Sequence, residues 1–205
     1  PAFEGQVHPL QLALDVQDAM GDGDWLVIDG GNTHFWSEIA VNIAGFQGKK
    51  LGGILHPGTF SLLGVGVSFA VSAKNVDPNR NVVLISGDGA FLSGGLSIEA
   101  AFQENRPIVV VIDNNGGLDC ISQQQERLFA SGTHYATDFR DIPFHAMFEG
   151  LGGHGELVTR REDIIPAVQR AMASGKTACV NVKVKGVISP IVLATTSKRD
   201  KASIE

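Results

Sequence analysis

Short apolar runs that alternate with helix-compatible segments constrain the fold of this chain more than any other feature. The runs are rich in Val, Ile and Leu and read as buried strands; they are residues 25–29, 81–86, 107–113 and 178–184. The segments between them have helical composition and spacing and are residues 62–75, 92–105, 143–151 and 162–174. Such alternation predicts a mainly parallel sheet covered on both faces, an α/β fold in three layers, α/β/α. Residues 1–8 and 188–205 are expected to be peripheral extensions.

Glycine, Asp and Asn gather where three of the expected strands end. These polar segments are residues 29–32, 86–89 and 113–117. Ligands of parallel α/β sheets bind at the carboxyl ends of the strands. We therefore expect a functional site at this edge of the sheet.

Charge and composition argue against several kinds of partner. A formal net charge of −6 with scattered Lys and Arg disfavours a sequence-independent nucleic-acid binder. No apolar run approaches the ~20 residues needed to cross a bilayer, so no membrane span is expected. Two cysteines far apart in sequence, Cys120 and Cys179, indicate neither a disulfide framework nor a zinc site, which fits a cytoplasmic setting.

The segment Gly87-Asp88-Gly89-Ala90 has the properties of an anion site. A strand ends there, two glycines allow a sharp turn, and the first N–H groups of a helix are left free to bind an anion. A carboxylate beside a phosphate is repelled unless a cation lies between them, and Mg²⁺ commonly joins protein oxygens to phosphates. After the next strand, Asn115 offers an amide oxygen and the pair 116–117 a flexible carbonyl. Each piece alone is also compatible with an ordinary turn or loop.

Together, Gly87-Asp88-Gly89 and the Asn pair ending at Asn115 resemble the signature of thiamine diphosphate enzymes. Asn115 follows Asp88 by 27 residues, in keeping with that signature. The resemblance implies thiamine diphosphate and Mg²⁺ as cofactors. It also implies that Asp88, the side chain of Asn115 and the backbone carbonyl of Gly117 ligate the metal, which holds the cofactor diphosphate.

The resemblance extends from His8 to about Val184 and is closest to the C-terminal domain of acetolactate synthases and their relatives, the 2-hydroxyacyl-CoA lyases. It implies a thiamine diphosphate-binding fold, with a diphosphate-binding domain over residues 1–187 and a C-terminal extension over 188–205. For the segment after the first strand, the alternative is an ordinary loop in which Asn32 and Thr33 are exposed. His34 in this segment is interpreted as structural. The cofactor-binding residues that the resemblance implies are Gly31, Asn32, Thr33, Ser61, Leu63, Gly87, Asp88, Gly89, Ala90, Asn115, Gly117 and Leu118.

The segment 58–66 resembles the family loop that supports the middle of the cofactor. By resemblance, Leu63 wedges between the two cofactor rings, and the Ser61 carbonyl accepts a hydrogen bond from the aminopyrimidine 4′-amino group. A second interpretation is that Leu62 and Leu63 simply begin a buried helix.

The stretch 116–129 matches acetolactate synthases without a gap but departs at three positions. Asp119 and Cys120 stand where the family has Gly and Met, and Gln124 stands where acetolactate synthases have the Trp that selects the second substrate. By resemblance, Leu63 and Gln124 are the catalytic positions. The exchange to Gln124 predicts an acceptor other than pyruvate or 2-oxobutyrate.

Nothing in the chain resembles the pyrimidine-binding domain, whose Glu protonates the cofactor N1′. The sequence therefore predicts one subunit of a split enzyme, or a fragment of a longer one, active only with a partner that carries this Glu. We expect a hetero-oligomer, a dimer of heterodimers or larger, acting on a small 2-oxo acid or an acyl-CoA.

Three functions remain open from the sequence. The first is the diphosphate- and Mg²⁺-binding part of an acetolactate-synthase-like 2-oxo acid decarboxylase or carboligase. The alternatives are a 2-hydroxyacyl-CoA lyase subunit and a non-catalytic regulatory paralogue. Another nucleotide-binding α/β protein is disfavoured, because the chain has neither a Gly-x-Gly-x-x-Gly turn after its first strand nor a Gly-Lys-Ser/Thr loop.

Overall fold

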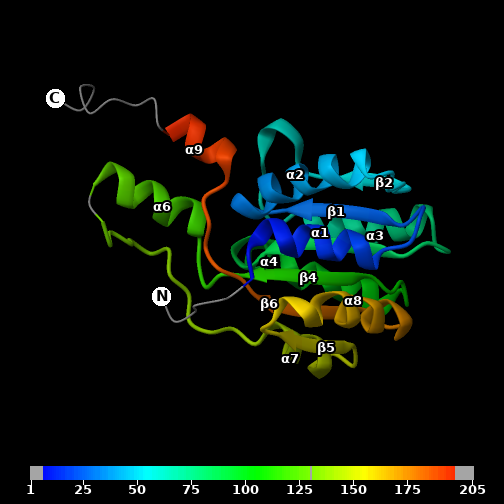
Figure 1. The fold of residues 1–205 in the computed structure, drawn as a ribbon. Coiled ribbons are helices and arrows are strands. Elements are labelled where there is room, and N and C mark those ends of the chain that lie inside the picture. The colour runs from blue at the N-terminus through cyan, green and yellow to red at the C-terminus, as the bar shows by residue number, and fades with distance from the viewer. Residues whose placement is uncertain (1–6, 130, 197–205) are drawn as a thin grey trace.

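A six-stranded parallel sheet forms the centre of the structure, a computed structural model that describes residues 7–129 and 131–196. The strand order is β2-β1-β3-β4-β6-β5, and every neighbouring pair is parallel (Figure 1). The predicted α/β fold is therefore confirmed. The strands are β1 Trp25–Asp29, β2 Gly53–Leu55, β3 Val82–Gly87, β4 Val109–Asn114, β5 His154–Val158 and β6 Ala178–Lys183.

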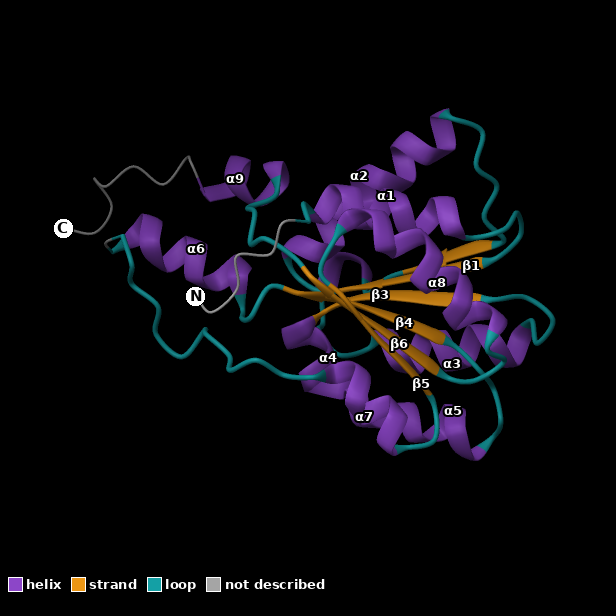
Figure 2. Ribbon diagram, turned by 60° about the horizontal axis from the view of Figure 1, so that its bottom comes forward, coloured by secondary structure: helices purple, strands orange, loops and turns teal. Residues whose placement is uncertain are grey.

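Helices cover both faces of the sheet and make it the middle of three layers (Figure 2). One face carries α1 Pro9–Ala19, α2 Asn32–Phe46 and α8 Ile164–Ala173, which pack on Val83 and Ile85 of β3. The opposite face carries α3 Gly66–Val76, α4 Asp88–Gly94, α5 Glu99–Gln103 and α7 Phe144–Gly150, which pack on Val82 and Leu84. Successive strand residues thus serve opposite cores, which is why the central strands are apolar throughout.

Two helices lie off the sheet, beyond the carboxyl ends of its strands (Figure 1). They are α6 Asp119–Leu128, which follows β4, and α9 Pro190–Thr196, which follows β6. Three short 3-10 turns complete the described elements: η1 Gly58–Phe60, η2 Gly95–Ile98 and η3 Arg161–Asp163. None of the helices in the described part of the chain is long and apolar enough to cross a membrane.

The segments around the sheet depart from two of the expectations. Val7 was expected to be peripheral, but it is fully buried, pairs in parallel with Val184 and accepts a 2.9 Å hydrogen bond from the backbone N–H of Lys185. Beyond β6, Ser189 is also buried, and its N–H donates to the Asn32 side chain at 3.0 Å. Residues 1–6 and 197–205 lie outside the described residues.

Candidate functional site

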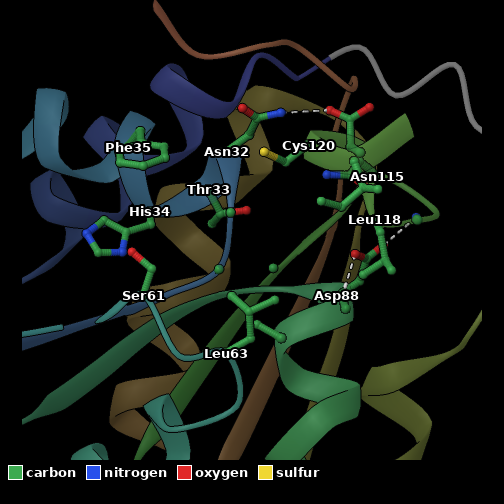
Figure 3. Close-up of a pocket in the computed structure, with 18 residues that line it drawn as sticks. Asn32, Thr33, His34, Phe35, Ser61, Leu63, Asp88, Asn115, Leu118 and Cys120 are labelled. Atoms are coloured by element: carbon green, nitrogen blue, oxygen red, sulfur yellow. Dashed lines mark hydrogen bonds between the residues drawn. The ribbon is translucent and has the colours of Figure 1, made fainter. Parts of the chain in front are cut away.

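A pocket of about 280 Å³ lies where the carboxyl ends of β1, β3 and β4 meet (Figure 3). The structure brings all twelve of the expected cofactor-binding residues together there. They are Gly31, Asn32, Thr33, Ser61, Leu63, Gly87, Asp88, Gly89, Ala90, Asn115, Gly117 and Leu118. Six further residues also line the pocket: Gly30, His34, Phe35, Asp119, Cys120 and Ile121.

Asp88 joins two of the strand ends through its carboxylate. It opens α4 and is only 2% exposed. One carboxylate oxygen accepts the N–H of Gly89 at 2.7 Å, and the other accepts the N–H groups of Gly116 at 2.8 Å and Gly117 at 3.0 Å. Burial raises the pKa of Asp88 to about 6, although these three donors act in the opposite direction. A cation beside this carboxylate would offset the cost of burying its charge.

Asn115 offers the second oxygen of the expected metal site. Its side-chain Oδ1 is buried and has no hydrogen-bond partner within the described residues. A buried acceptor without a donor costs free energy, so an oxygen in this state calls for a ligand. Carboxylate and amide oxygens are the hard ligands that Mg²⁺ prefers, and the residues therefore fit a magnesium ion.

Gly117, the third expected ligand, is held in a narrow space. Its N–H donates to Asp88, and a Cβ at this position would lie 2.5 Å from the carbonyl oxygen of Thr137. Only glycine fits this close approach between two backbone segments. The loop after β4 is thereby fixed beside Asp88.

Thr33 is engaged by a buried carboxylate that the sequence reasoning did not single out. Its hydroxyl donates to Asp113 Oδ2 at 2.8 Å. Burial raises the pKa of Asp113 to about 7; the bond from Thr33 lowers it and the charge of Asp88 raises it further. While Asp113 is ionised, the Thr33 hydroxyl hydrogen is committed to it, and the oxygen lone pairs remain for other contacts.

Asn32 is buried and links α2 to α6 and to the segment before α9. Its amide donates to Gln123 at 3.0 Å and to Asp119 at 3.3 Å, and its carbonyl oxygen accepts the N–H of Ser189. Asn32 and Thr33 are both buried in the first turn of α2. The interpretation of this segment as a loop with exposed side chains is therefore wrong.

A third buried carboxylate, Asp29, fixes the loop that carries Ser61 and Leu63. Its Oδ2 accepts the N–H groups of Gly64 at 3.0 Å and Gly66 at 2.7 Å. Leu63 lines the pocket and is 38% exposed. Because α3 begins only at Gly66, the interpretation of Leu62 and Leu63 as the start of a buried helix is wrong. Asp29 lay in the polar segment after the first strand, but nothing in the sequence indicated its distant partners.

Gln124 stands apart from the other expected residues. It is not among the described residues that line the pocket. Its amide nitrogen lies 3.5 Å from the sulfur of Cys120, which does line it. An influence of Gln124 on substrate choice stays a prediction, and within this chain it would act through Cys120.

Several known proteins are similar to this chain in sequence. The family described as "Thiamine pyrophosphate enzyme, C-terminal TPP binding domain" matches residues 29–182. An acetolactate synthase large subunit of Mycobacterium tuberculosis is 34% identical over 182 residues, which cover 86% of this chain and 31% of that protein. Human 2-hydroxyacyl-CoA lyase 2 is 27% identical over 86% of this chain and 28% of its own length.

The solved structures include a similar fold. The thiamine diphosphate-dependent 4-hydroxybenzoylformate decarboxylase of Rhodococcus jostii RHA1 matches with a TM-score of 0.74 and 26% identity. The match covers 92% of this chain and 34% of that one. The chain thus spans about a third of the length of these relatives.

Proposed function

This chain belongs to the thiamine pyrophosphate enzyme family. On that premise we propose that its pocket binds thiamine pyrophosphate, which is also called thiamine diphosphate, through Mg²⁺. The observation that carries the proposal is that one pocket at the carboxyl edge of the sheet is lined by the buried carboxylate of Asp88 and by Asn115, whose buried amide oxygen has no partner in the described residues. Both ligands are oxygens, and Mg²⁺ characteristically keeps positions for phosphate oxygens.

The remaining pocket residues have roles in binding and orientation. Asp88, Asn115 and the Gly117 carbonyl hold the metal, and Gly31, Gly87 and Gly89 line the pocket on the side of the diphosphate. Leu63 supports the cofactor rings from the side of the 58–66 loop, with Ser61 as a hydrogen-bond acceptor. When bound, thiamine diphosphate supplies the carbon nucleophile for reactions at a 2-oxo acid carbonyl, and the protein supplies orientation and charge compensation.

Activity in this proposal requires a pyrimidine-binding domain, supplied by a separate subunit or by another part of a longer polypeptide. The chain covers about a third of its relatives, and the loop that supports the cofactor exposes Phe60 and Leu62 beside the pocket. Apolar side chains that lie exposed next to a binding site are typical of an interface. We infer a partner that covers this loop and contributes the Glu for the cofactor N1′, in a hetero-oligomer.

The overall reaction that we propose is decarboxylation or carboligation of a 2-oxo acid, as in acetolactate synthases. The 34% identity to an acetolactate synthase supports this choice over the reactions of thiamine diphosphate enzymes that are less similar in sequence.

A second candidate is cleavage of a 2-hydroxyacyl-CoA. Similarity to 2-hydroxyacyl-CoA lyase 2 favours it, as does the polar Gln124 where acetolactate synthases have a Trp. Assays of the reconstituted complex with 2-oxo acids and with 2-hydroxyacyl-CoAs separate the two candidates. A non-catalytic regulatory paralogue is supported instead if a genuine partner binds but Mg²⁺ and cofactor do not.

Thermal shift measurements test the cofactor proposal directly. The chain is measured alone and with pyrimidine-domain chains, with and without Mg²⁺ and thiamine diphosphate, and wild type is compared with Asp88→Ala. Ligand binding at a hundredfold excess over Kd stabilises the folded state by about 2.7 kcal/mol. We expect stabilisation that needs metal and partner and disappears in Asp88→Ala. Equal stabilisation of the variant would contradict the proposed metal ligand.

A further inference from the structure

Two histidines and a glutamate converge beside the sheet edge, outside the predicted magnesium site. His34 and Glu38 lie one turn apart on α2, and His56 follows β2. Glu38 Oε1 lies 2.9 Å from His34 Nε2 and 4.0 Å from His56 Nδ1, and the three ligand atoms all lie within 4.8 Å of one another. The two imidazole rings meet edge to face at 5.2 Å between centroids.

These distances are close to those of a three-ligand metal site. With metal–ligand bonds of about 2.0–2.1 Å, two ligand atoms of a tetrahedral zinc site lie about 3.3 Å apart. The distances of 2.9 and 4.0 Å fall on either side of that value. His34 is buried, whereas His56 is partly exposed and follows a three-residue edge strand, so His56 is the ligand free to adjust. His56 Nδ1 also accepts a long hydrogen bond, 3.3 Å, from the N–H of Gly58.

Other histidine–carboxylate pairs in the described residues lack this geometry. His134 contacts Glu126 with Nε2 and Asp138 with Nδ1, so its two carboxylates lie on opposite sides of the ring and cannot share one ion with it. His154 contacts Glu156 at 2.7 Å without a third ligand close by. Among the described residues, His34, Glu38 and His56 form the one group of three His, Cys, Asp or Glu side chains whose ligand atoms lie close enough to hold a single ion.

A cavity leaves room for a fourth ligand. A hollow of about 420 Å³ is lined by Glu38 and His56, together with Ile28, Val41, Asn42 and Ile54. His34 lines the neighbouring pocket that contains Asp88 and appears there in Figure 3. An ion held by the three side chains would lie between the two hollows, with a coordination position left for water or a small anionic ligand.

We propose that His34, Glu38 and His56 bind a divalent transition metal of the Zn²⁺ class, separate from the Mg²⁺ site. Two imidazoles and one carboxylate suit Zn²⁺ and other late first-row ions, whereas an all-oxygen set suits Mg²⁺. The ligand chemistry therefore separates the two sites. The assignment does not depend on whether thiamine diphosphate binds.

Calorimetric titration of the metal-free chain with Zn²⁺ tests the site. Asp88→Ala serves as the background, so that the predicted magnesium site does not contribute. We expect one Zn²⁺ equivalent, and we expect both His56→Asn and Glu38→Gln to weaken binding by more than about tenfold, the loss that even supporting residues of metal sites cause. Both side chains are partly exposed, so these variants should fold even if substitution of the buried His34 does not.

His154→Asn is the matched control, because it removes a histidine that contacts one carboxylate. Its Zn²⁺ affinity should equal that of the background. Substitution of Zn²⁺ by Co²⁺ adds a spectroscopic readout, since ligand-field bands report tetrahedral coordination by nitrogen and oxygen. Absence of Zn²⁺ binding, unchanged affinity in His56→Asn and Glu38→Gln, or an equal loss in His154→Asn would each overturn the proposal. The cluster would then be only a hydrogen-bonded His34–Glu38 pair.

Discussion

Asn115 is the residue whose substitution best separates metal binding from stability. Its buried Oδ1 makes no hydrogen bond in the described structure, so Asn115→Ala removes an oxygen that has no partner there. We expect the unfolding free energy of the metal-free chain to change by less than about 1 kcal/mol. Mg²⁺-dependent cofactor affinity in the complex should fall at least about tenfold, which is about 1.4 kcal/mol. Urea denaturation and a Mg²⁺ titration measure the two quantities.

Asn75→Ala is the control for that substitution. Asn75 is exposed on α3 and contacts Glu104 far from the pocket, so cofactor affinity should stay at the wild-type value. If Asn115→Ala retains full Mg²⁺ affinity, its amide oxygen is not a ligand.

Asp29 is expected to matter for the loop rather than for the metal. Asp29→Ala leaves the N–H groups of Gly64 and Gly66 without their acceptor, and a buried donor in that state costs about 1–3 kcal/mol. Asp29→Asn keeps an acceptor oxygen and should be milder. We expect Asp29→Ala to lower Tm by several degrees, at about 2–4 °C per kcal/mol for a chain of this size, and to speed proteolysis within residues 58–65. Equal melting of the Ala and Asn variants would argue against an anchoring role.

The sequence predicted the pocket residues well where the signal was local. Asp88 and Asn115 follow successive strands, whose ends meet at one edge of a parallel sheet, and the resemblance to thiamine diphosphate enzymes assigned them to one site. Asp29 and Asp113 were not singled out, because their partners, Gly64, Gly66 and Thr33, are 35 to 80 positions away in the chain. A strand-terminal Asp gives no indication in the sequence of which distant N–H or hydroxyl it accepts from.

The contact between β5 and α8 predicts a pH dependence of stability. Burial acts to raise the pKa of Glu156, but the hydrogen bonds and charges of Arg170 and His154 outweigh it and hold the pKa below its ordinary value of 4.5. The folded state thus binds this proton less readily than the unfolded chain. The stabilisation is complete above the unfolded pKa and is lost as pH falls through the folded pKa.

Glu156→Gln should therefore be less stable than wild type near neutral pH, and the difference should shrink as pH falls below about 4. Urea denaturation across the acid range measures it, with Glu99→Gln on the surface of α5 as control. Because the pair is partly exposed, the effect should be small and reduced by salt. A difference that stays constant at acid pH would rule out the ionised Glu156 as its cause.

The central strands were predicted within two residues, whereas the edge strands were missed. β1, β3, β4 and β6 are apolar on both faces and stand out in the sequence. β2 has three residues and β5 begins with His-Gly-Glu, so neither carries a hydrophobic run. The helices α1, α2, α6 and α9 were also missed as elements. The first residues of α2 and α6 belong to the polar segments in which binding residues were predicted, and α9 lies in the predicted C-terminal extension.

The exposed loop beside the pocket is where we expect the proposed pyrimidine-binding domain to bind. Phe60 is 96% exposed in η1, next to the pocket residue Ser61. Phe60→Glu should weaken association with a pyrimidine-domain chain by at least about tenfold, since aromatic side chains often dominate interfaces. The melting temperature of the Phe60→Glu variant alone should equal that of the wild type, because the Phe60 side chain is exposed.

Phe46→Glu provides the comparison for Phe60→Glu. Phe46 is 93% exposed at the C-terminal end of α2, away from the strand ends that form the pocket. Its substitution should therefore leave association unchanged. Sedimentation velocity or surface-binding kinetics measures both variants. Equal association of the two variants would direct the search for an interface elsewhere.

Val7 and Val184 bring the segment that enters the sheet next to the segment that leaves β6. A domain whose entry and exit lie side by side can be joined to other sequences, or separated from them, at one side of its fold. The six-stranded sheet and the three strand ends of the pocket then stay intact.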